Sequence, residues 1–192
     1  MHTMTKNLAF ILILVFSTPL LAVEVKGIHV KEKISQPSTK QTLILNGTGI
    51  RTKFIFDIYV GALYLPQKSS DAQQIINSPE AKRISMHFLY DKIEKQKMTD
   101  GWSDAFADNI SETELANLKE QIKQFNSYFP DIVKGDVVVI DFIPNSGASI
   151  TINTHLKGTI AGDDFQKALL AIWFGDSPPN EDLKEGMLGI VD

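Results

Sequence analysis

The residues from Leu43 to Leu65 constrain the fold of this chain most, because their polarity alternates over a long distance. From Phe54 onward the even positions are all apolar or aromatic, namely Phe54, Phe56, Ile58, Val60, Ala62 and Tyr64. The odd positions are mixed, and that face carries Arg51, Lys53, Asp57 and Tyr59. Successive side chains of a strand point to opposite faces, so the pattern predicts one long strand with a buried even face. Phe54, Phe56 and Ile58 are therefore expected in the core.

The remaining elements predict an α+β fold. Gly47 and Gly49 indicate a tight turn or bulge after a first strand over 42–46. Further strands are predicted over residues 23–34, 83–90, 136–143 and 149–155, with 156–160 extending the last or forming another. Helices are predicted over residues 71–77 and 95–110, from the capping box at 111–114, from 163, and over 180–188. Because strands and helices are grouped rather than strictly alternating, we expect a largely antiparallel sheet with helices packed on one face.

The first 22 residues have the composition of a secretory signal peptide. Lys6 precedes an unbroken apolar run from Leu8 to Phe16, and Pro19 and the small Ala22 follow. The run is shorter than the about 20 residues that span a bilayer. We expect cleavage near Ala22, a periplasmic or secreted location, and no stable membrane span after cleavage. Residues 23–192 then form one domain.

Composition excludes several classes of function. The chain has a formal net charge of −4 and no basic run, which gives no indication of nucleic-acid or anionic membrane binding. It has no cysteine, so disulfides, thiolate zinc sites and cysteine nucleophiles are excluded. His29, His87 and His155 lie in separate predicted strands, and the sequence contains no GxSxG, HExxH or P-loop motif. No metal or cofactor is expected.

Arg51 and Tyr59 are the candidate site residues. They are eight positions apart and share parity, but a straight strand would separate them by about 26 Å. They can meet one ligand only if the backbone turns between them or the ligand is long. A planar guanidinium suits a carboxylate or enolate, and Tyr59 would add a hydroxyl donor. The alternative is that Arg51 pairs with Asp57 or a loop carboxylate while Tyr59 is half-buried packing. The residues alone do not choose between these interpretations.

Two motifs resemble the chalcone isomerase-like superfamily, in its bacterial secreted branch. One is NGTGIR followed by a strand ending in YVGALYL, and the other is ALLAIWFGDSPPNEDLKEGMLG. The resemblance extends from Val25 to Gly189 and implies an open-faced, largely antiparallel sheet covered on one face by helices, with a cleft between them. In true chalcone isomerases an arginine after the GxG turn binds and polarises the substrate, and Arg51 matches it. Tyr59 stands where those enzymes have a water-ordering threonine.

The other isomerase positions are not retained. The enzymes' tyrosine and asparagine fall near Glu94 and Gly101, and their serine or threonine falls near Gln166. Relatives with the arginine and a strand tyrosine bind fatty acids without isomerising anything. The resemblance therefore implies an exported, non-catalytic binder of a small amphipathic acid such as a fatty acid, with Arg51 and Tyr59 as ligand-binding residues.

Two alternatives remain open from the sequence. One is an intramolecular lyase of the chalcone–flavanone isomerase type, with Arg51 as the electrophile. The other is a structural or partner-binding module without a ligand. Two tryptophans also bear on the cleft. Trp173 shares helical spacing with Phe165 and Leu169, which predicts a core position. Trp102 is predicted to be a core residue as well, although its neighbours Asp100 and Gly101 at the helix start could line a cleft mouth.

Overall fold

The computed structural model describes residues 22–190, so the predicted signal peptide lies outside the described residues except for Ala22. Seven strands of this part form one sheet in the order β11-β10-β9-β6-β5-β4-β3, and every neighbouring pair is antiparallel. Their bounds are β3 (Lys33–Ser35), β4 (Thr42–Lys53), β5 (Phe56–Leu65), β6 (Lys82–Phe88), β9 (Val137–Ile143), β10 (Gly147–Ile152) and β11 (His155–Ile160). Two further antiparallel pairs are the hairpin of β1 (Ala22–Val25) with β2 (Ile28–Lys31), and the long-range pair of β7 (Lys92–Ile93) with β8 (Ile132–Val133).

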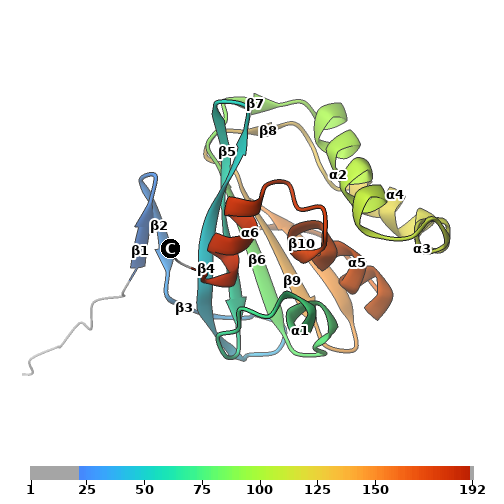
Figure 1. Cartoon of the computed structure of the whole chain (residues 1–192), viewed down its shortest axis with the longest axis horizontal. Coiled ribbons are helices and arrows are strands. Elements are labelled where there is room, and N and C mark those ends of the chain that lie inside the picture. The colour runs from blue at the N-terminus through green and yellow to red at the C-terminus, as the bar shows by residue number, and fades with distance from the viewer. Residues whose placement is uncertain (1–21, 191–192) are drawn as a thin grey trace, which may run out of the picture.

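The helices form a layer on one side of the sheet, and the β1–β2 hairpin lies on the other side (Figure 1). They are α1 (Ala72–Asn77), α2 (Lys95–Asn109), α3 (Glu112–Asn117), α4 (Lys119–Ser127), α5 (Asp163–Phe174) and α6 (Glu181–Leu188). The predicted α+β class, with a largely antiparallel sheet and helices on one face, is confirmed. The capping box at Ser111 and Glu114 is present, although the predicted helix divides at Leu118 into α3 and α4. No helix within residues 22–190 is long and apolar enough to cross a membrane.

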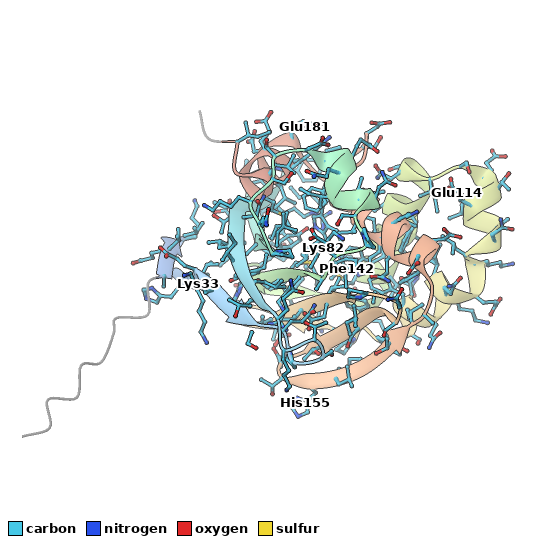
Figure 2. The ribbon with its side chains drawn as sticks, turned by 90° about the horizontal axis from the view of Figure 1, so that it is seen from below. Lys33, Lys82, Glu114, Phe142, His155 and Glu181 are labelled. Carbon is cyan, nitrogen blue, oxygen red and sulfur yellow. The ribbon has the colours of Figure 1, made fainter. Side chains whose placement is uncertain are left out.

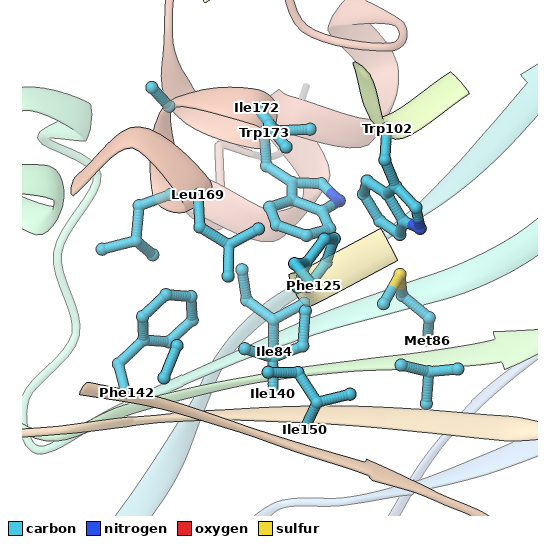
Figure 3. Packing of buried hydrophobic residues seen from close by; sticks show 14 of the residues in the cluster. Ile84, Met86, Trp102, Phe125, Ile140, Phe142, Ile150, Leu169, Ile172 and Trp173 are labelled. Atoms are coloured by element: carbon cyan, nitrogen blue, oxygen red, sulfur yellow. The ribbon is translucent and has the colours of Figure 1, made fainter. Parts of the chain in front are cut away.

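Apolar side chains fill the space between the sheet and α5. Ile84, Ile140, Phe142 and Ile150 rise from the strands toward Leu169 and Trp173, as Figure 3 shows. A smaller apolar cluster covers part of the opposite face and includes Val30 of β2 and the β4–β5 residues Leu43, Val60 and Tyr64. Figure 2 shows charged side chains such as Glu114 and Glu181 on the periphery. The central strands are buried on both faces wherever this smaller cluster covers the face opposite to the helices.

The predicted single strand is in fact a hairpin, so the expected burial is wrong at its start. Lys53 pairs with Phe56, which leaves Phe54 and Ile55 as a two-residue loop. Phe54 is 92% exposed and Phe56 49% exposed, whereas Ile58 is buried as expected. The loop holds no Gly, Pro, Asn or Asp, and Phe54 takes a φ of +57° where glycine is favoured. The usual sequence signals of a turn are thus absent, and the alternation runs straight through it.

Gly47 and Gly49 lie inside β4 and do not form a turn. A register shift between Leu45 and Gly47 confirms the predicted bulge. A Cβ atom at Gly49 would lie 2.5 Å from the carbonyl oxygen of Leu183 in α6. The glycines therefore allow α6 to cross β4 with backbone almost touching backbone. The two motifs that carry the family resemblance pack against each other at this crossing.

Candidate ligand-binding cleft

A cleft of about 440 Å³ lies between the end of the β4–β5 hairpin and helix α2. This volume is within the range of small-molecule sites, about 300–1,000 Å³. Apolar and aromatic side chains make most of its wall: Phe54, Phe56, Ile58, Tyr59, Tyr90, Ile93, Met98, Trp102, Ala105, Ile172 and Pro179. Four cationic side chains also line it: Arg51, Lys53, Lys92 and Lys97. An apolar wall with several cations suits an amphipathic anion.

The hairpin places Arg51 and Tyr59 side by side. The two residues are direct partners across β4 and β5, and the Arg51 guanidinium carbon lies 5.8 Å from the centre of the Tyr59 ring. That distance is within the reach of a cation–π contact. The register shifts between Arg51 and Thr52, so Ile58 is the extra residue of a bulge and joins the same core as Tyr59. The turn between the two site residues is therefore what brings them together.

Arg51 forms no ion pair with any residue from 22 to 190. Asp57, the partner offered by the alternative interpretation, instead binds Lys26 with Nζ and Oδ2 3.0 Å apart. The Nε atom of Arg51 is buried and makes no hydrogen bond with the described part of the chain. A buried N–H without an acceptor costs about 1–3 kcal/mol, and more when the group is charged. An anionic acceptor placed in the cleft would remove that cost.

Tyr59 is set up as a hydrogen-bond donor. Its ring is 2% exposed, and its hydroxyl oxygen accepts a hydrogen bond of 3.0 Å from Nε1 of Trp173. Burial raises the pKa of Tyr59, while the positive Arg51 and the Trp173 bond act in the opposite direction. The hydroxyl consequently keeps its proton at neutral pH. Because the indole N–H of Trp173 occupies one lone pair, the O–H of Tyr59 is left to donate to a ligand.

Trp102 is a third donor, whose role the sequence did not predict. Its side chain is 6% exposed and lines the cleft, and its Nε1 has no hydrogen-bond partner in residues 22–190. The Trp102 ring packs on Trp173 with centroids 5.6 Å apart, and its nitrogen lies on the edge turned away from Trp173 (Figure 3). The sequence predicts a core position for Trp102 and assigns the cleft mouth only to its neighbours Asp100 and Gly101. The missing signal was the donor geometry, which depends on packing between α2 and α5.

The remaining predicted positions add no polar group to the cleft. Gly101 lines it but has no side chain, and Glu94 precedes α2 as its N-cap without a capping hydrogen bond. Gln166 lies on α5, where its amide contacts Asp163. Trp173 is fully buried, as predicted. Within residues 22–190 no group of three His, Cys, Asp or Glu side chains is placed to hold a metal ion.

The fold and the cleft together define a sheet-and-helix domain with a cationic, mostly apolar pocket, and sequence comparison assigns the family. Residues 22–189 match the family described as chalcone isomerase-like. The chain therefore belongs to the chalcone isomerase-like family. No curated protein matches the sequence.

A solved structure supports the fold. The crystal structure of a fatty-acid binding protein from Arabidopsis thaliana superposes with a TM-score of 0.65 at 13% sequence identity. The match covers 82% of this chain and 96% of the plant protein. At this identity the likeness establishes the shared fold.

Proposed function

We propose that this protein is an exported, non-catalytic binder of a small amphipathic acid, with a fatty acid as the ligand class. The carrying observation is Arg51, whose Nε is buried at an apolar cleft with no acceptor in the described residues. The plant protein of similar fold is a fatty-acid binding protein, which is consistent with this ligand class. The predicted signal peptide supports export, with cleavage near Ala22.

The carboxylate of the acid would bind at Arg51. A guanidinium can donate two charge-assisted hydrogen bonds to a carboxylate, and these are about twice as strong as neutral ones. Tyr59 and Trp102 would add one neutral donor each. The inner end of the cleft is closed by aromatic packing, since Trp102 contacts both Phe125 and Trp173. An alkyl chain would therefore run outward along Phe56 and Met98 toward the tip of the hairpin.

The experiment is calorimetric titration of delipidated protein with oleate. Arg51→Lys should weaken binding by about 1.5–3 kcal/mol, because a point charge loses the two-pronged geometry. Tyr59→Phe and Trp102→Phe should each weaken it by about 0.5–1.5 kcal/mol, the value of a neutral hydrogen bond. Arg83→Lys is the matched control. Arg83 pairs with Asp141 at 2.7 Å on β6 and β9, outside the cleft, so this variant should bind oleate like the wild type.

Equal affinities of the wild type and the three cleft variants for oleate would show that this cleft is not the binding site. That result would favour a structural or partner-binding module without a ligand. Turnover of a chalcone that is lost in Arg51→Ala would instead favour the intramolecular lyase. Isomerisation gains from several donors placed around the developing enolate, and the positions near Glu94, Gly101 and Gln166 supply none here. We therefore expect no cyclisation above the rate in solution.

A further inference from the structure

The tip of the β4–β5 hairpin exposes large apolar side chains to water. Phe54 is 92% exposed and Ile55 89% exposed, and the neighbouring Phe56 is half exposed. Phe54 also holds a φ of +57° at a turn position where glycine is favoured. Neither its conformation nor its exposure helps the fold. Adjacent exposed apolar side chains of this size are typical of a surface that meets an apolar partner.

Three lysine side chains from separate elements line the cleft beside this tip. Lys53 belongs to the end of β4, Lys92 to β7 and Lys97 to α2, and all three line the cleft mouth. Lys92 is paired with Asp131, with Nζ and Oδ2 2.8 Å apart. Lys53 and Lys97, like Arg51 behind them, form no ion pair with residues 22–190, so three unpaired cations line this region. The chain as a whole has a formal net charge of −4, which makes the local excess distinctive.

We propose that the hairpin tip docks on a lipid bilayer that contains anionic headgroups. Phe54 and Ile55 would enter the headgroup region, and Lys53 and Lys97 would lie against the negative surface. Apolar side chains flanked by lysines are the composition that binds such interfaces, where each lysine contributes about 1 kcal/mol. The sequence contains no basic run, so this arrangement exists only in the folded chain.

The docking surface is continuous with the ligand-binding cleft. Lys53, Phe54 and Phe56 line the cleft and belong to the tip as well. Phe54 lies three positions beyond Arg51, about 10 Å along extended backbone, so the mouth would face the bilayer while Arg51 lies behind it. A fatty acid could then pass between bilayer and cleft without crossing water. That transfer rests on the proposed ligand binding, whereas the docking itself does not.

The test is flotation of delipidated protein with two kinds of vesicle. One is phosphatidylcholine alone, and the other is phosphatidylcholine and phosphatidylglycerol in equal parts. The wild type should float more strongly with the mixed vesicles, and high salt should weaken this because it screens the lysines. Ile55→Ser should reduce the partition coefficient about tenfold. Lys53→Gln and Lys97→Gln should each reduce it about fivefold.

The β11 pair Leu156 and Lys157 provides the matched control. Both residues are exposed, and β11 is the edge strand at the other end of the sheet from β3, far in strand order from the hairpin. Leu156→Ser and Lys157→Gln remove the same kinds of side chain and should leave flotation unchanged. A wild type that does not float, or an Ile55→Ser variant that floats equally well, would overturn the proposal. Self-association that Ile55→Ser abolishes, without flotation of the wild type, would make the tip a protein interface and also overturn it.

Oleate titration separates this proposal from the ligand site. Ile55 does not line the cleft, so Ile55→Ser should bind oleate like the wild type while losing vesicle binding. Loss of oleate binding in Arg51→Lys with flotation intact would be the reverse pattern. If oleate fails to bind at all and the protein still floats, the docking surface stands and the proposed ligand does not.

Discussion

Phe54 is the residue at which the local conformation is least explained by folding. A bulky side chain in the left-handed region costs about 1–2 kcal/mol, and this one packs on almost nothing. Phe54→Gly should remove that strain, while the greater conformational entropy of glycine in the unfolded chain offsets part of the gain. The net effect should be a stabilisation of about 0.5–1 kcal/mol. The measurement is the urea midpoint of unfolding. Ile55→Gly is the control and should lower the midpoint, because Ile55 is not among the residues with positive φ. A lower midpoint for Phe54→Gly would show that its side chain stabilises the fold.

The residue scale also shows why the sequence located the site only in part. Arg51 and Tyr59 have the same parity, so the sequence alone indicates that their side chains lie on the same face of the sheet. Whether they meet depended on a turn at Phe54 and Ile55 that carries none of the usual turn residues. Arg51 does not pair with Asp57 because Asp57 forms its ion pair with Lys26, a residue far from Arg51 in the sequence. Such pairings depend on tertiary contacts, so they cannot be predicted from the local sequence pattern.

At the scale of elements, the crossing of α6 over β4 positions one wall of the cleft. Pro179 lines the cleft just before α6, and Nδ2 of Asn180 donates a hydrogen bond of 3.3 Å to the carbonyl oxygen of Ile50, next to Arg51. The crossing needs glycine because backbone atoms of Leu183 occupy the space of a side chain at Gly49. Helix and strand positions were largely predictable from their periodicity, whereas this close approach was read from the sequence as a turn or bulge.

Gly49→Ala should therefore destabilise the protein by about 1–3 kcal/mol, the usual cost of overpacking. It should also weaken oleate binding, since α6 must shift away from the cleft. Gly101→Ala in α2 is the matched control, because a Cβ atom there meets nothing within 4 Å. That variant should be more stable by about 0.5–1 kcal/mol through the lost chain entropy of glycine. Urea unfolding of both variants measures these changes. A neutral Gly49→Ala would mean that α6 is not held at this distance.

At the scale of the whole molecule, the antiparallel sheet and the helical layer followed from the order and periodicity of the elements. The position of the cleft did not, because its wall comes from β4, β5, β7, α2, α5 and the loop before α6, which are spread along the chain. The lysines of the cleft mouth illustrate the same point. They are scattered between positions 53 and 97 and become one surface only when the hairpin packs beside α2. When a site is assembled from many elements, each element contributes only one or a few of its functional residues, so no single segment of the sequence predicts the site.

The most direct measurement follows the carboxyl group of the bound acid. Oleate carrying a carbon-13 label at the carboxyl carbon would be titrated by NMR when bound to the wild type and to Arg51→Gln. An apolar cleft alone raises the pKa of a carboxyl group, whereas a neighbouring guanidinium lowers it. We expect the carboxyl of oleate to titrate at a lower pH in the wild type than in Arg51→Gln. The same titration midpoint in both proteins would show that the carboxylate does not bind at Arg51.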